Sequence, residues 1–215
     1  MPLPFADREE AGRDLTRALE PLGLERPLVL AVPRGGVSVA APVANALGGD
    51  LDVVVVRKIG APTQPELGIG AVGASGEPWL DERLIGMLGV TREQLQREVD
   101  VQRAEARRRL EAYRDAGRPL DAAGRDVVVV DDGIATGGTV LAAGRILRAL
   151  GPRRVVLAVP VAPAEGVRRA QTVYDEVVAV HTPEPFYAVG QWYRDFHQVS
   201  DDEVQALLAG VSQNP

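Results

Sequence analysis

The sequence predicts an α/β fold: a doubly wound, mainly parallel β-sheet of about five strands, with a helical insertion and a small C-terminal cap, or hood. Short runs of Val, Leu and Ile recur along the chain, and they are apolar throughout, as strands buried on both faces are. Segments with helical spacing separate these runs, which favours parallel strands joined by right-handed crossovers. One long stretch between Lys58 and Arg125 interrupts the alternation, and we expect the insertion there.

The first third of the chain predicts two strands and two helices. Asp7 is a candidate N-cap for a helix that ends near Leu19. A strand is expected at residues 27–32, followed by a helix at 37–47 that two glycines close. A second strand is expected at residues 51–56.

The second half predicts three more strands, at residues 126–130, 154–159 and 173–180. Helical patterns at 138–150 and 164–170 alternate with them. Residues 1–215 are therefore expected to form a single domain, with a lid loop and helical insertion at 59–125 and a C-terminal cap at 182–215.

Two kinds of segment make up the predicted insertion. Residues 59–78 are rich in Gly and Pro, which indicates a mobile loop or a hairpin, and this segment is the candidate lid. Residues 91–113 form a strong helical pattern, and Thr91 with Gln94 makes a capping box. The arginines of this helix alternate with acidic residues, so we interpret them as a solvated, ion-paired face and not as a nucleic-acid patch.

Composition limits the classes of function. The chain has 215 residues, a net charge of −6 and no cysteine. The negative charge argues against a nucleic-acid partner, and no apolar run approaches the roughly 20 residues of a membrane span. The lack of cysteine fits a cytoplasmic protein. A homodimer is left open.

The most informative stretch is VVVVDDGIATGGTV, residues 127–140. Its valines predict a buried strand, and Asp131 and Asp132 follow at the carboxyl end of that strand. Open α/β sheets bind ligands at this end of their strands. The turn that follows offers uncovered backbone N–H groups and hydroxyls beside a helix N-terminus, which is a cradle for phosphate. Carboxylates repel phosphate but accept hydrogen bonds from neighbouring sugar hydroxyls. The motif therefore predicts a sugar phosphate as ligand.

Two alternatives compete with this interpretation. Asp131 and Asp132 could be the N-cap of an ordinary βα loop. A nucleotide P-loop is excluded because no Lys follows the glycines.

Basic residues follow the first two predicted strands. Arg34 precedes Gly35 and Gly36 after the first strand, and Arg57 and Lys58 follow the second. In a parallel sheet these turns lie along one edge together with the carboxylate pair. These turns therefore predict two anion pockets with a diol-binding pair of carboxylates between them. Such a site suits a ribose that carries phosphate at one end and a phosphorylated leaving group at the other.

Residues 127–139 resemble the phosphoribosyl-pyrophosphate (PRPP) signature of the type I phosphoribosyltransferases, and the resemblance extends over residues 27–58 and 126–181. It implies that Asp131 and Asp132 hold the ribose hydroxyls, and that Lys58 contacts pyrophosphate. Residues 34–36 match the family's pyrophosphate loop, in which an unusual peptide geometry is common. The implied cradle of the 5′-phosphate comprises Ala135, Thr136, Gly137, Gly138 and Thr139. The family uses Mg²⁺ held mainly by substrate oxygens, so no dedicated protein metal site is expected.

The implied reaction is displacement of pyrophosphate from ribose C1 by a nitrogenous base or amine. The alternative is a PRPP-binding regulator with little catalysis. Ala135 stands where family members acting on 6-oxopurines carry an acid, and Glu66, with Glu77 second, is the candidate substitute in the lid. The competing interpretation, that each is a solvent-exposed loop acid, is favoured for both. Trp192 and Tyr193 could stack on the base or could form the core of the cap.

Overall fold

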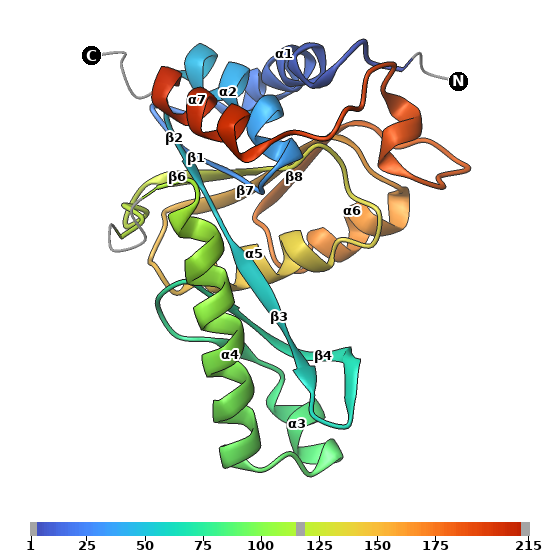
Figure 1. Ribbon diagram of the computed structural model, residues 1–215. Helices are drawn as coiled ribbons and strands as arrows, with labels where there is room; N and C mark the ends of the chain where they lie inside the picture. Colours follow the sequence, from blue (N-terminus) through green and yellow to red (C-terminus); the bar gives the residue numbers. More distant parts are fainter. Residues whose placement is uncertain (1–3, 115–118, 212–215) are drawn as a thin grey trace.

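A computed structural model describes residues 4–114 and 119–211. Residues 115–118 of the predicted insertion and the last four residues of the predicted cap lie outside the described residues, as do the first three of the chain. The described part contains a five-stranded sheet and a three-stranded sheet. Figure 1 shows the smaller sheet projecting from one side of the larger one, with helix α4 beside it.

The larger sheet confirms the predicted doubly wound architecture. Its strands run in the order β2-β1-β6-β7-β8, and every neighbouring pair is parallel. The strand bounds are β1 (Leu28–Ala31), β2 (Asp50–Val53), β6 (Asp126–Val130), β7 (Arg154–Val161) and β8 (Glu176–His181). All residues of β1 and β6 are buried, as the unbroken apolar runs predict.

Helices cover both faces of this sheet (Figure 1). Helices α1 (Arg8–Leu19), α2 (Gly35–Leu47) and α7 (Asp201–Val211) share one core cluster with one face. Helices α5 (Gly138–Arg148) and α6 (Ala164–Ala170) lie over the other face. The four predicted helices among these are present, and Asp7 caps α1 by accepting from the Glu10 N–H. No helix of the described segments is both long and apolar enough to cross a bilayer.

The insertion forms the smaller lobe. Strands β3 (Val56–Ala61), β4 (Gln64–Gly73) and β5 (Trp79–Leu80) pair antiparallel, and helices α3 (Glu82–Leu88) and α4 (Arg92–Glu111) follow. The segment predicted as a loop or hairpin is thus a hairpin, and α4 begins at the predicted capping box of Thr91. Helix α3 lies where no helix was predicted.

The strand predicted at residues 51–56 is wrong in its length. Strand β2 ends at Val53, and Val56 already begins β3 in the other sheet. The run of four valines serves two cores, because Val53 packs on the α1–α2 side and Val54 on the α5 side. A continuous apolar run therefore conceals the point where the chain changes sheets.

The C-terminal segment packs against Phe5 and the first turns of α1. Residues 189–192 form a 3₁₀ turn, and Phe5 bridges to Tyr193 in a parallel arrangement. Phe5, Trp192 and Tyr193 share a small core with Ala11 and Val161. This contact brings the beginning of α1 next to the carboxyl ends of the strands.

Candidate functional site

Two loops meet at the carboxyl end of the sheet because β1 and β6 are adjacent and end at the same level. Ala31 is in register with Val130, and the Val32 N–H continues the ladder to the Val130 carbonyl at 2.8 Å. Asp131 and the loop that starts at Pro33 therefore emerge side by side. The sequence-predicted pairing of the acidic turn with the Arg34 loop is present in the structure.

Glycines allow these loops to touch. A Cβ on Gly35 would overlap Oδ2 of Asp132 and lie 2.8 Å from its Cγ. A Cβ on Gly36 would lie 2.8 Å from the Val130 carbonyl oxygen. The peptide between Pro33 and Arg34 is cis, which agrees with the unusual geometry expected of this loop.

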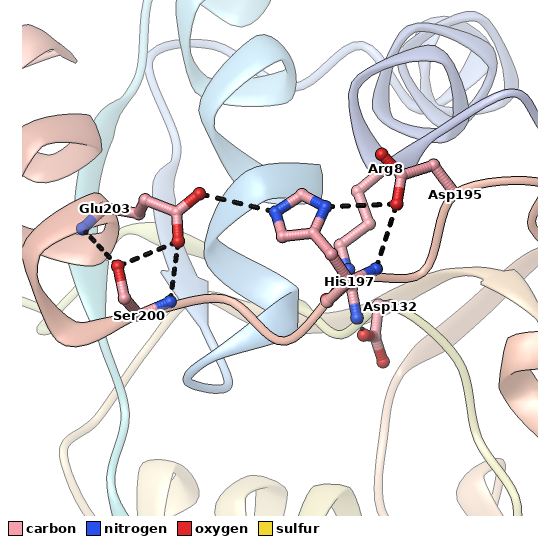
Figure 2. A network of polar contacts seen from close by, with 6 residues as sticks. All are labelled: Arg8, Asp132, Asp195, His197, Ser200 and Glu203. Atoms are coloured by element: carbon pink, nitrogen blue, oxygen red, sulfur yellow. Dashed lines mark hydrogen bonds and ion pairs between the residues drawn. The ribbon is translucent and has the colours of Figure 1, made fainter.

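Arg8 makes an ion pair with Asp132 that no pattern in the sequence predicts. Its Nε donates to Oδ2 of Asp132 at 2.9 Å, and its Nη1 donates to the His197 carbonyl at 2.9 Å. Figure 2 shows Arg8 reaching from α1 to the carboxylate below the C-terminal segment. Arg8 and Asp132 are 124 positions apart, and no motif in the sequence marks the pairing.

The two carboxyl groups ionise less readily than free aspartates. Loss of hydration and the charge of Asp132 raise the pKa of Asp131 well above its usual range. Loss of hydration also raises the pKa of Asp132, while the hydrogen bond and charge of Arg8 oppose that rise. Electrostatic strain of this kind is relieved when a ligand donates hydroxyl groups to carboxylates.

The raised pKa of Asp131 predicts a pH effect on stability. Above the ordinary aspartate pKa of about 3.9, the folded protein holds a proton that the unfolded chain has released. The stabilisation is full below that pH and is lost as the pH rises through the folded-state pKa. We therefore expect the stability of D131N to fall less than that of the wild type as the pH rises from about 4 towards neutrality. Thermal unfolding of both proteins across this range tests it, and parallel curves would contradict it.

The predicted phosphate loop is open to solvent. Gly133 and Ile134 are buried, and a Cβ on Gly133 would lie 2.6 Å from a methyl of Val189. Residues 135–139 are exposed apart from Gly137, which is half-buried. Gly137 has a left-handed backbone conformation with φ of 77°. Helix α5 begins immediately afterwards, so its free N–H groups lie beside the loop. This geometry fits an anion cradle.

A cleft of about 650 Å³ joins the carboxylate pair to the arginines of several elements. The polar residues that line it are Arg34, Arg57, Arg108, Arg109, Tyr113, Asp131, Asp132, Thr139 and Asp201. Arg34, Arg57 and Thr139 belong to the predicted site. The α4 arginines were predicted to face solvent, and the structure places Arg108 and Arg109 at the cleft. Asp201 comes from α7, and sequence spacing gave no signal for it.

Acidic side chains of the protein itself pair with these arginines. Glu105 accepts hydrogen bonds from Arg108 at 2.8 Å and from Arg109 at 2.7 Å, and these bonds lower the Glu105 pKa to about 2. Asp201 lies 3.8 Å from Arg34 and accepts from the Tyr113 hydroxyl at 3.0 Å. Four arginines and three aspartates line the cleft, so its lining has more positive than negative side chains.

Lys58 does not line the cleft. It lies within β3, where side chains alternate between faces, so Arg57 faces the cleft and Lys58 faces the other way. The Lys58 ammonium donates to the Glu66 carbonyl at 2.9 Å and lies 3.5 Å from the Glu66 carboxylate. Glu66 is fully exposed and Glu77 is exposed, and neither is brought to Asp131.

Trp192 and Tyr193 are buried in the core of the cap, with 5% and 6% of their surface exposed. The Tyr193 hydroxyl donates to the Asp132 carbonyl, so Tyr193 supports the acidic turn from behind. This placement favours the cap-core interpretation of both residues over base stacking.

Comparison with known proteins agrees with this geometry. Residues 10–189 match the family model of the phosphoribosyl transferase domain. Rv0571c of Mycobacterium tuberculosis, provisionally named a phosphoribosyl transferase, is 46% identical over 212 residues, which are 95% of this chain and 46% of that protein. The chain thus spans about half the length of the curated relatives it matches.

Two solved structures are also similar. TT1426 from Thermus thermophilus is 50% identical, with a TM-score of 0.88 over 97% of this chain and 99% of that one. A hypothetical protein from Neisseria gonorrhoeae with bound ppGpp has a TM-score of 0.51 at 14% identity, over 97% of this chain and 96% of that chain. The second likeness shows a shared fold alone.

Proposed function

This chain belongs to the phosphoribosyl transferase family, and from that premise we propose that it transfers a 5-phosphoribosyl group from PRPP to a nitrogenous base or amine and releases pyrophosphate. The observation that supports this most is that a carboxylate pair, four arginines and Thr139, the last residue of the glycine-rich loop, line one cleft. Ribose hydroxyls suit the carboxylates, and the two phosphorylated ends of PRPP suit the loop and the arginines.

The order of the strands supports a direction for the ligand. The acidic turn follows β6, the Arg34 loop follows β1, and the α4 arginines lie beyond the end of β2. In this arrangement the ribose lies at Asp131 and Asp132, its 5′-phosphate lies at residues 135–139, and the pyrophosphate extends towards Arg34 and Arg57. The acceptor then approaches C1 from the opposite side, where Val189 of the C-terminal cap lies against Gly133.

The proposed chemistry breaks the bond from ribose C1 to the pyrophosphate oxygen and forms a bond from C1 to the acceptor nitrogen, which loses a proton. Asp131 and Asp132 orient the ribose by accepting from its hydroxyls. Arg34, Arg57 and the backbone N–H groups of the two loops stabilise the charge of the departing pyrophosphate. The hairpin β3–β4 remains the candidate lid that excludes water from the oxocarbenium-like sugar.

Magnesium fits this site as a substrate-bound ion. Among residues 4–114 and 119–211, no group of three or more His, Asp or Glu side chains could hold a metal by itself. Pyrophosphate and ribose oxygens with water would supply its oxygen ligands, beside the acidic turn that holds the ribose. Bound in this way, Mg²⁺ would neutralise charge on the pyrophosphate.

A PRPP-binding regulator is the second candidate, and one observation favours it. Ala135 offers no acid in the loop, and Glu66, its candidate substitute, is fully exposed and pairs with Lys58 away from the carboxylates. A protein that binds PRPP without proton transfer at an acceptor would need no such acid.

One experiment distinguishes the two candidates. PRPP binding to the wild type is measured by titration calorimetry with Mg²⁺, and pyrophosphate release is then measured with a panel of purine and pyrimidine bases and simple amines. Turnover on any acceptor supports the transferase, and binding without turnover supports the regulator. Absence of PRPP binding would overturn both.

The arginines of α4 give a sharper test of the ligand's direction. Replacing Arg108 and Arg109 together by glutamine removes two cations from the pyrophosphate side of the cleft, so we expect the Kd for PRPP to rise about tenfold, equivalent to about 1.4 kcal/mol. The matched control is the double variant R97Q/R107Q, because both arginines form the same kind of surface pair, with Glu93 at 3.4 Å and Glu111 at 3.2 Å, but do not line the cleft. Equal effects of the two variants on calorimetric PRPP affinity would show that only the general charge of α4 matters.

A further inference from the structure

Arg8 is buried against the acidic turn although it is an arginine on the first turn of a surface helix. It has 7% of its surface exposed. Its guanidinium lies 3.9 Å from the centre of the Phe196 ring and 5.9 Å from that of Tyr193. A planar guanidinium stacks on aromatic faces and donates hydrogen bonds to a carboxylate in its own plane. The aromatic rings and the Asp132 carboxylate together therefore fix the orientation of the Arg8 guanidinium.

The pair between Arg8 and Asp132 is largely removed from water. The side chains are 8% and 16% exposed, and the distance from Nε to Oδ2 is 2.9 Å. Arg8 binds one carboxylate oxygen and thereby leaves the other available to a ligand hydroxyl. Asp131 is held differently, because its Oδ1 accepts from the Asp132 N–H at 2.9 Å. The two aspartates of the turn therefore have distinct supports.

Arg8 also connects the acidic turn to the C-terminal segment. Its second hydrogen bond goes to the His197 carbonyl, and the His197 ring lies 3.2 Å from Asp195 and 3.3 Å from Glu203 (Figure 2). Glu203 accepts from the Ser200 N–H at 2.7 Å, which fixes the start of α7. The next residue, Asp201, lines the cleft. Arg8 thus ties the carboxylate to the segment that closes the far side of the site.

We infer that Arg8 is a positioning residue for sugar binding: it fixes the orientation and the charge of the Asp132 carboxylate, through which the ribose of PRPP is held. This inference rests on the proposed function. Nothing in the motif that contains Asp132 indicates it, since Arg8 lies on another element at the start of the chain.

The same geometry predicts how pH acts on binding. Asp132 faces Asp131 in its own turn, Arg8 from α1 and the Tyr193 hydroxyl from the cap. Arg8 is the cation of this set. Its removal leaves two neighbouring carboxyl groups beside one another, and they then share a proton up to a higher pH. If PRPP binding needs both carboxylates, it is lost as the pH falls and they become protonated. In a variant without Arg8 this loss should begin at a higher pH than in the wild type.

The test compares R8Q, R8K and the control R13Q, with PRPP affinity measured by calorimetry between about pH 5 and pH 8. Arg13 lies on the same helix and pairs with Glu9 at the surface. We expect R8Q to raise the Kd for PRPP about tenfold or more and to shift the pH midpoint of binding upwards, by the loss of one charge-assisted hydrogen bond. R8K should restore the midpoint more than the affinity, because lysine keeps the charge but lacks the planar fork. R13Q should bind as the wild type does.

A purely structural role is separated by a double-mutant cycle with D132N. If Arg8 acts through Asp132, R8Q adds little to the loss caused by D132N. Additive losses, or an R8Q protein with lower thermal stability but unchanged affinity and pH midpoint, would overturn the inference while the proposed function stands. If the wild type does not bind PRPP, the proposed function fails and the inference fails with it.

Discussion

The double variant D131N/D132N is expected to lose PRPP binding by a factor of about 100 or more while it remains folded. Each carboxylate accepts from ribose hydroxyls in the proposed complex, and a hydrogen bond to a charged group contributes about 1.5–3 kcal/mol. Loss of two such bonds corresponds to about 10² to 10⁴ in affinity. The fold should survive, because the raised pKa of each carboxyl group shows that its charge is poorly compensated, and Arg8 keeps its hydrogen bond to the His197 carbonyl. Calorimetry with PRPP and Mg²⁺, together with thermal unfolding, measures both effects.

The same strand supplies a matched control. Asp126 lies at the other end of β6, is 2% exposed, and accepts from Arg153 at 2.8 Å and from Arg154 at 3.0 Å. These arginines hold the pKa of Asp126 below its usual range. D126N should therefore lower the free energy of unfolding by about 1–3 kcal/mol and leave PRPP affinity unchanged. Retained affinity in D131N/D132N, or an equal loss in D126N, would contradict the ribose assignment.

The acidic turn was predictable because its signals are local. A fully apolar strand, two acids and a glycine-rich start of a helix are consecutive in the sequence, and the geometry of parallel sheets places such a turn at the ligand edge. The loop at Arg34 was predictable for the same reason, since it follows the neighbouring strand β1. Local order thus predicts the two loops that meet at the centre of the site.

Residues that reach the site from other elements could not be predicted in this way. Arg8 lies on α1 and Asp201 on α7, and each is an ordinary polar residue of a helix start. Arg108 and Arg109 carry the same ion-pair spacing as the surface arginines of α4, so their sequence pattern is that of a solvated face. Only the packing of α4 against β3 brings them to the cleft.

Lys58 shows a second reason why the sequence does not predict the whole site. Its expected contact with pyrophosphate required the strand of residue 51 to continue to residue 56, so that both basic residues would follow the end of the strand. Because β3 begins at Val56, Arg57 and Lys58 are successive residues of one strand and point to opposite faces. The alternation of side chains along β3 therefore decides which of the two cations faces the cleft. A contact of Lys58 with pyrophosphate remains a prediction that depends on movement of the hairpin.

Alanine substitutions at the two glycines of the Arg34 loop should separate effects on ligand binding from effects on folding. In G35A the new methyl would overlap the Asp132 carboxylate, which is the end of a side chain, so the side chain can rotate away from Arg8 and the fold can persist. In G36A the methyl meets backbone atoms instead, with the Val130 carbonyl oxygen at 2.8 Å and the Asp131 Cα at 3.1 Å. Side chains rotate at small cost, whereas moving β6 from the start of α2 disturbs a packed core.

We therefore expect opposite outcomes for the two substitutions. G35A should raise the Kd for PRPP about 30-fold or more, by displacing one charge-assisted acceptor, and its loss of stability should come only from the Arg8–Asp132 pair, not from the backbone packing of the two loops. G36A should lower the free energy of unfolding by about 1–3 kcal/mol, as overpacking does. Calorimetry and thermal unfolding of both variants test the pair. If G35A bound PRPP with the affinity of the wild type, the observed position of the Asp132 oxygen would not be the one that holds the sugar. The close approach of Gly35 would then serve only the packing of the two loops.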